Sequence, residues 1–176
     1  MPAQNYLSGA LLAAFTLTVS FAQAANVPRQ NGYIDAAIQQ HNLHRANHSA
    51  AAIQWDATIA NIAQNHALLC DFEHTQNGKY GENLAVAGAS NTTEAGRINA
   101  VRTAVTNQWY NGEVNSFDPF YGQASPGGNF GDYGHFTQVV WAATTKVGCG
   151  TNLCQAGTIA ADYATWYTVC NYDPAV

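Results

Sequence analysis

Residues 134–141 read Gly-His-Phe-Thr-Gln-Val-Val-Trp, a glycine and a histidine followed by a largely apolar run. A run of this length fits either a short helix or a buried strand, and periodicity does not decide between the two. The segments that follow, 144–151 and 165–172, are rich in Val, Thr, Tyr and Trp. They predict strands of an antiparallel sheet.

The chain before this stretch predicts three helices. Apolar residues recur at helical spacings over 33–47, 55–70 and 91–112. Asn91 is the predicted N-cap of the third helix, with Glu94 three residues later. Helices followed by strands, rather than an alternation of the two, indicate the α+β class. We expect a three-layer α-β-α sandwich with a central antiparallel sheet.

Two glycine-containing segments interrupt these elements. Residues 71–90 lose the helical periodicity and predict an irregular connection. Residues 117–134 combine prolines and glycines with aromatic side chains and predict a loop. Connections of this length are often functional.

The N-terminal 25 residues are typical of a signal peptide. An apolar run over 7–22 ends in Ala22-Gln23-Ala24, a small-x-small cleavage pattern. The run is shorter than the roughly 20 residues that a helix needs to span a bilayer, so no stable membrane anchor is expected. We predict that residues 1–25 are removed and that 26–176 form a single, secreted, monomeric domain.

Charge and cysteine content narrow the function further. The formal net charge is −5 with only 6 Lys plus Arg, which argues against a nucleic-acid partner. Four cysteines, an even number in a secreted chain, favour two disulfides over zinc ligation, and three pairings are open. Asn47-His48-Ser49 and Asn91-Thr92-Thr93 are N-glycosylation sequons.

Four polar residues lie in or beside glycine-containing turns, namely His74, Glu82, Glu113 and His135. Two imidazoles and two carboxylates can hold zinc, copper or nickel, or act as general acid and base. Their spacing matches no local metal motif. The other histidines, on predicted helices, are expected to be hydrogen-bond partners: His41, His44, His48 and His66.

Residues 81–85, Gly-Glu-Asn-Leu-Ala, and residues 134–141 resemble the two signature blocks of the cysteine-rich secretory, antigen 5 and pathogenesis-related (CAP) superfamily. Trp55-Asp56 and Cys170-Asn171-Tyr172-Asp173-Pro174 extend the resemblance, which covers about 33–174. It is closest to fungal and plant pathogenesis-related members. The resemblance implies an α-β-α sandwich and disulfides Cys70–Cys149 and Cys154–Cys170.

The resemblance also places the family's cleft tetrad on His74, Glu82, Glu113 and His135, where a divalent metal such as Zn²⁺ can bind. The alternative is that each residue only cross-links a loop, since an unpaired buried polar group costs roughly 1–3 kcal/mol.

Some relatives bind sterols or fatty acids, and the resemblance puts their sterol-binding loop just before and into the His135 block. The aromatic residues of this region are Phe117, Phe120, Tyr121, Phe130, Tyr133 and Phe136. Each ring either contacts a lipid or only packs the loop onto the domain. We therefore expect an extracellular protein that binds a small lipid, a sterol or a fatty acid. The alternatives are a defence or virulence interaction protein without a lipid ligand and, less favoured, a metal-dependent hydrolase.

Overall fold

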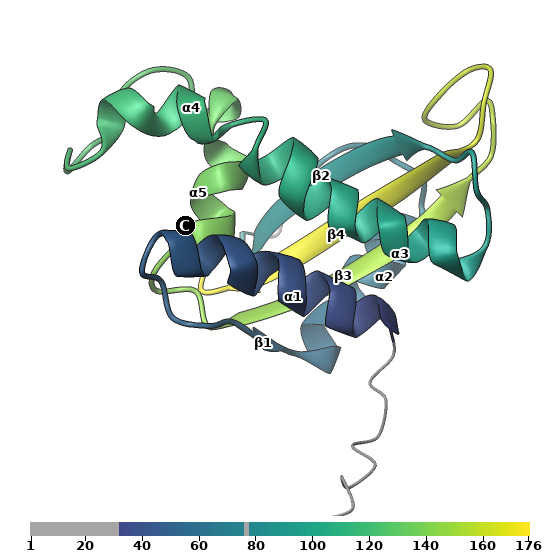
Figure 1. Ribbon diagram of the computed structural model, residues 1–176. Helices are drawn as coiled ribbons and strands as arrows, with labels where there is room; N and C mark the ends of the chain where they lie inside the picture. The colour runs from purple at the N-terminus through teal and green to yellow at the C-terminus, as the bar shows by residue number, and fades with distance from the viewer. Residues whose placement is uncertain (1–31, 76–77) are drawn as a thin grey trace, which may run out of the picture.

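The computed structural model describes residues 32–75 and 78–176, so the predicted signal peptide lies outside the described residues. The first half contains α1 (Gly32–Asn47), β1 (Gln54–Trp55), α2 (Ala57–Leu68) and β2 (Gly81–Gly88). Then α3 (Glu94–Thr103) continues into a π-helical segment, η1 (Ala104–Tyr110). Three short pieces follow: α4 (Val114–Phe117) and the 3-10 turns η2 (Asp118–Phe120) and η3 (Phe130–Asp132). The chain closes with α5 (Gly134–Val140), β3 (Lys146–Cys154) and β4 (Thr165–Asp173) (Figure 1).

The four strands form one sheet in the order β1-β3-β4-β2. Strand β4 is antiparallel to both of its neighbours, and the two-residue β1 pairs with β3 in parallel. Helix α2 packs on one face of the sheet, while α1, α3 and η1 cover the other (Figure 1). The predicted α+β class and three-layer α-β-α sandwich are confirmed.

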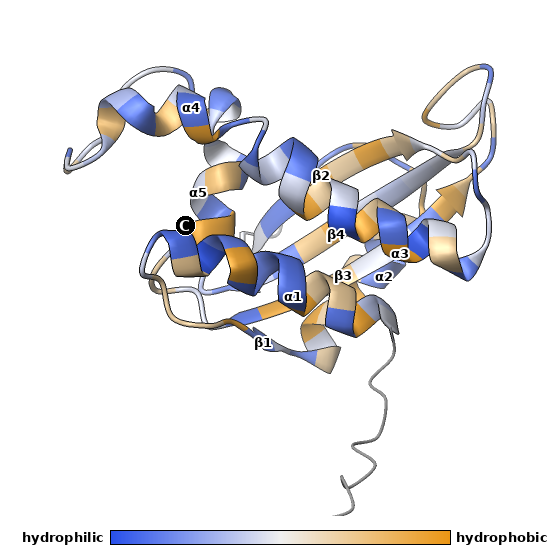
Figure 2. Ribbon diagram, viewed as in Figure 1, coloured by the Kyte–Doolittle hydropathy of each residue, from blue (hydrophilic) through white to orange (hydrophobic). Residues whose placement is uncertain are grey.

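Each face of the sheet has its own core. The larger cluster lies under α1, α3 and η1 and includes Tyr33, Val105 and Trp109. The Trp109 indole also donates a hydrogen bond of 2.9 Å to the carbonyl of Leu84 in β2. The smaller cluster lies under α2 and contains Tyr167. Helices α1 and α3 carry hydrophilic and hydrophobic residues together, as expected of helices with one face on a core and one in solvent (Figure 2).

Helix α2 approaches β3 closely because β3 has glycines at the contact. A Cβ at Gly148 would lie 2.1 Å from the backbone nitrogen of Ala60, and one at Gly150 would lie 2.3 Å from Cα of Gln64. Asp56 sets the start of α2, since its Oδ1 accepts hydrogen bonds from two backbone N–H groups of the first turn. The position of α2 therefore depends on local capping and on small residues in the sheet.

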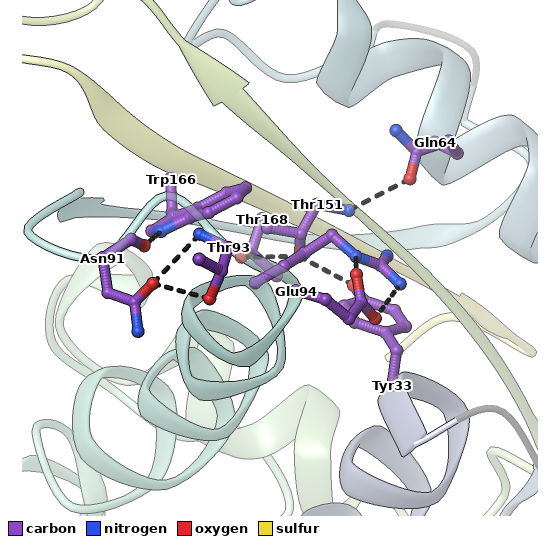
Figure 3. Close-up of polar contacts among 9 residues, drawn as sticks. Tyr33, Gln64, Asn91, Thr93, Glu94, Thr151, Trp166 and Thr168 are labelled. Atoms are coloured by element: carbon purple, nitrogen blue, oxygen red, sulfur yellow. Dashed lines mark hydrogen bonds and ion pairs between the residues drawn. The ribbon is translucent and has the colours of Figure 1, made fainter.

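Buried polar contacts join the helices to the sheet. The Tyr33 hydroxyl of α1 lies 2.7 Å from Thr151 Oγ1 in β3, which lies 2.9 Å from Thr168 Oγ1 in β4 (Figure 3). Arg45, also buried on α1, donates to four backbone carbonyls: those of Ala51, Val139, Trp141 and Thr144. The C-terminal half of α1 is thereby fastened to the segment that follows α5.

Several local predictions are corrected. Residues 81–88 form strand β2 rather than part of an irregular connection, because all eight pair with β4, from Gly81 opposite Tyr172 to Gly88 opposite Thr165. The residue preceding α3 is Thr93, and Asn91 accepts from Thr93 instead of capping the helix. The run at 134–141 is a helix over most of its length, and the predicted loop 117–134 contains η2 and η3.

Two disulfides are present, as predicted, but both pairings implied by the resemblance are wrong. The bonds join Cys149 to Cys170 and Cys70 to Cys154. Cys149 and Cys170 are register partners on β3 and β4 with their Cα atoms 4.1 Å apart, so they pair with each other. Cys154, at the end of β3, is left to meet Cys70 beyond the end of α2. Within the described ranges, no helix is long and apolar enough to cross a membrane.

Candidate functional site

A cleft of about 310 Å³ lies where β2, α5 and the last residues of the chain meet. Its polar lining includes His74, Glu82, His135 and Gln138, and its apolar lining includes Phe130 and Val176. Three of the four predicted tetrad residues thus line one cleft. The fourth, Glu113, reaches it through a contact with His135.

Glu82, on β2, is the polar centre of one side of this cleft. Its Oε1 accepts from His74 Nδ1 at 3.0 Å and from the Thr75 backbone nitrogen at 2.9 Å. Its Oε2 accepts from the Thr75 hydroxyl and from His66 Nδ1, both at 3.0 Å. The Glu82 side chain is only 6% exposed, so these donors compensate for the burial of its carboxylate.

His66 was not among the predicted site residues, yet it extends the site into the core. Its Nδ1 contacts Glu82, and its Nε2 lies 3.2 Å from the hydroxyl of Tyr167. Burial raises the pKa of Tyr167 well above its ordinary value, so this phenol stays protonated and can donate to the imidazole. A chain of contacts therefore runs from Tyr167 through His66 and Glu82 to His74.

His135 and Glu113 form the second pair of the tetrad. His135 Nδ1 lies 2.5 Å from Glu113 Oε1, and the Phe136 backbone nitrogen donates to Glu113 Oε2 at 2.9 Å. Glu113 therefore sits at the N-terminal end of α5, where the helix dipole favours an anion. The Trp109 ring lies parallel to the His135 imidazole, with 6.3 Å between centroids. Asn83 donates to the carbonyl of His135 and fixes the same residue from β2.

The tetrad is thus arranged as two carboxylate–imidazole pairs. In both pairs the carboxylate contacts Nδ1 of the imidazole and so orients the ring. Within residues 32–75 and 78–176, no group of three or more His, Cys, Asp and Glu side chains is placed to hold a metal ion.

Five of the six predicted aromatic residues lie on the arm of residues 114–133, which projects beyond the sheet (Figure 1), and the sixth, Phe136, lies on α5. The Phe117 ring contacts four of the other predicted rings, Phe120, Tyr121, Tyr133 and Phe136. Tyr133 and Phe136 are buried by these contacts, whereas Tyr121 and Phe130 are more than half exposed. Of the six predicted rings, all within the described residues, Phe130 lines the cleft, and its ring lies 5.8 Å from that of Tyr133.

A second histidine cluster joins α1 to this arm. His48 Nε2 lies 2.9 Å from the Tyr110 hydroxyl, and His48 Nδ1 lies 3.5 Å from that of Tyr121. His44 stacks on Tyr110 with 3.8 Å between ring centroids. Burial lowers the pKa of both histidines, and the neighbouring imidazole lowers that of His44 further. His44 and His48, like His41, make hydrogen bonds, as predicted for these histidines.

The fold and the cleft define a class: a disulfide-linked α-β-α sandwich whose cleft, beside the edge strand β2, is lined by two histidines that contact carboxylates. The model of the CAP family, described as the cysteine-rich secretory protein family, matches residues 38–172. The chain belongs to this family.

Known relatives agree with this assignment. The chain is 38% identical over 146 residues to a probable pathogenesis-related protein of Arthroderma benhamiae, covering 81% of the chain and 44% of that protein. It is 32% identical over 175 residues to a PR-1 type pathogenesis-related protein of Sambucus nigra, covering 97% and 90%. The solved structure of NaASP2 with Zn²⁺ shares the fold, with a TM-score of 0.57 and 22% identity over 83% of this chain and 81% of that one. Because the chain spans less than half of the Arthroderma protein, we do not assign the activity of that full-length protein to this chain.

Proposed function

We propose that this pathogenesis-related CAP protein is an extracellular binding protein for a small lipid, a sterol or a fatty acid. The observation that carries the proposal is the position of Phe130, which lines the His/Glu cleft and also joins the aromatic cluster of the arm through Tyr133. A series of ring contacts therefore starts at the cleft with the exposed Phe130 and continues through the buried Tyr133 to Phe117 on the arm. Two disulfides agree with an extracellular location.

The two ends of such a ligand match different parts of this surface. A hydroxyl or carboxylate head group suits the polar side of the cleft, where His74 and His135 offer imidazole groups. The apolar body suits Phe130 and Val176, which are 57% and 45% exposed. Covering a large apolar side chain in full contributes about 1.5–3 kcal/mol, so Phe130 and Val176 supply part of the roughly 8 kcal/mol that micromolar binding requires.

A second function, binding of a divalent metal such as Zn²⁺, is favoured by one separate observation. Both cleft histidines have Nδ1 held by a carboxylate, an arrangement that is common behind metal-ligating histidines. When bound, the ion would supply a positive charge and open coordination positions to an anionic head group. We propose His74 and His135 as its ligands, with Glu82 and Glu113 as their hydrogen-bond acceptors.

The contacts of Glu82 favour binding over hydrolysis. A general base needs a carboxylate oxygen that can receive the proton of an attacking water. Both oxygens of Glu82 already accept two hydrogen bonds each. This carboxylate is therefore suited to positioning His74 rather than to accepting a proton.

The test is equilibrium binding of a radiolabelled sterol and, separately, a labelled fatty acid to the purified chain, with unlabelled competitors. We expect saturable, displaceable binding of one class that Phe130→Ala weakens at least tenfold. Tyr163→Ala is the matched control, because Tyr163 is also more than half exposed but does not line the cleft. Binding that is equal in the two variants would place the ligand elsewhere, and no binding would favour an interaction protein recognised through its surface.

A further inference from the structure

We propose that Asn91 carries an N-linked glycan, and that the first sugars of this glycan lie against the ring of Tyr163. The site is separate from the His/Glu cleft: it lies between the end of β2 and the start of α3. The proposal depends on the conformation of the Asn91 side chain, on the rigidity of its backbone and on a hollow beside it.

The Asn91 carboxamide presents its nitrogen outward. Its Oδ1 accepts from the Thr93 backbone nitrogen at 3.0 Å and from the Thr93 hydroxyl at 2.7 Å. Because the oxygen faces these donors, Nδ2 lies on the opposite side, away from the contacts, as Figure 3 shows. Asn91 is exposed, so a sugar on Nδ2 breaks none of these hydrogen bonds.

The backbone at Asn91 is fixed from two sides. Its carbonyl accepts a hydrogen bond of 2.9 Å from the indole nitrogen of Trp166 (Figure 3). A Cβ at Gly96 would lie 1.9 Å from the same carbonyl oxygen, so α3 approaches it through a glycine. A glycan here would leave the protein from a defined point, which lowers the entropy lost when its sugars settle on the surface.

A shallow hollow of about 320 Å³ lies next to this point, lined by Gly88, Ala89, Ser90, Tyr163 and Ala164. A smaller hollow, which Asn91 itself lines, shares Gly88 and Ser90 with it. The hollow beside Asn91 and the hollow beside Tyr163 are therefore neighbours, with Gly88 and Ser90 in the wall of both. The Tyr163 ring is 60% exposed and offers an aromatic face of the kind on which the apolar face of a pyranose stacks.

The other sequon is less suited to a glycan. Asn47 is the last residue of α1, and its Nδ2 points to the Tyr110 hydroxyl at 3.5 Å. The same hydroxyl contacts His48, which links α1 to the aromatic arm. A sugar on Asn47 would disturb this cluster, whereas one on Asn91 would cover an exposed ring.

The modification is a group transfer from a lipid-linked pyrophosphoryl oligosaccharide in the secretory pathway. The Nδ2–C1 glycosidic bond forms, the C1–oxygen bond to the pyrophosphate breaks, and Nδ2 loses one proton. The lipid pyrophosphate is the leaving group, and no oxidation or reduction occurs.

The site is tested on the full chain secreted from a eukaryotic host. Peptide N-glycosidase treatment in H₂¹⁸O converts a glycosylated asparagine to ¹⁸O-labelled aspartate, which mass spectrometry locates. We expect the label at Asn91, its loss in Asn91→Gln and its retention in Asn47→Gln. Label at Asn47 alone, at neither sequon or equally at both would overturn the proposal.

The contact between the glycan and the Tyr163 ring is tested by thermal unfolding before and after the glycan is trimmed. Trimming is expected to lower the Tm by about 2–4 °C in the parent chain, the shift that a single ring contact produces in a domain of this size. In Tyr163→Ala the same trimming should leave the Tm unchanged, while Phe72→Ala should behave like the parent. An equal loss in all three chains would overturn this part of the proposal.

Discussion

His66 Nδ1 lies 3.0 Å from Glu82 Oε2, and this contact joins the buried core under α2 to the cleft. Both side chains are about 6% exposed, whereas His74, on the other oxygen of Glu82, is 52% exposed. The exposed imidazole is therefore oriented by a carboxylate that a buried imidazole holds in place.

Replacing His66 with Ala should weaken binding of Zn²⁺ without removing either proposed ligand. Loss of the carboxylate that hydrogen-bonds a metal-ligating histidine typically costs 10–100-fold in affinity. His66 acts one contact further back, on that carboxylate, so we expect a loss of up to about tenfold. Titration calorimetry with Zn²⁺ measures the change, and His48→Gln, a histidine variant outside the cleft, is the control. If both variants bind Zn²⁺ as the parent chain does, Glu82 needs no support from the core.

Gly148→Ala should destabilise the domain by separating α2 from β3. The added methyl would lie 2.1 Å from the Ala60 nitrogen, which is backbone and cannot rotate away. Overpacking of this kind typically costs about 1–3 kcal/mol. Urea unfolding measures the cost, with Gly127→Ala as the control, because a Cβ there would make an ordinary contact of 3.5 Å. Equal free energies of unfolding for the two variants would contradict the close approach.

The elements predicted correctly are those whose local pattern agrees with their final surroundings. Helices α1 and α2 follow apolar periodicity, and β3 and β4 follow β-branched and aromatic composition. Strand β2 was missed because its short sequence has glycine at both ends, and what makes it a strand is pairing with β4, more than 70 residues later.

In the cleft, too, some residues could be predicted from local sequence, whereas their partners depend on long-range packing. Glu82 and His135 stand in recognisable sequence blocks, but the partnership of Glu82 with His66 depends on how α2 docks against the sheet. One signal was available: His66 shares a helix face with Ile59 and Ala63, which are buried. That pattern identified the buried face but not the carboxylate opposite it.

The disulfide pairings depend on strand register, which cysteine spacing does not contain. Two double variants test the observed pairs: Cys70→Ala with Cys154→Ala, and Cys149→Ala with Cys170→Ala. The bonds span 84 and 21 residues, so loop-closure entropy predicts losses of roughly 4–5 and roughly 3–3.5 kcal/mol. Urea unfolding measures each loss, and each variant should retain the other bond in a non-reducing peptide map. Scrambled bonds would contradict the pairing.

The free energy of unfolding should fall as the pH drops from about 6.5 to about 4, mainly because of His41. This imidazole is buried between the Ala37 carbonyl and the Tyr172 hydroxyl, and its desolvation lowers its pKa to about 4. Since a free imidazole titrates near 6.5, the unfolded chain binds a proton in this window that the folded chain does not. The loss reaches about 3 kcal/mol near pH 4, and urea unfolding at pH 7, 5.5 and 4.5 follows it. The lowered pKa values of His44 and His48 act in the same direction.

His41→Gln, which cannot titrate, should have a flatter profile of unfolding free energy against pH than the parent chain. Identical pH profiles for the two chains would show that His41 is not the group responsible.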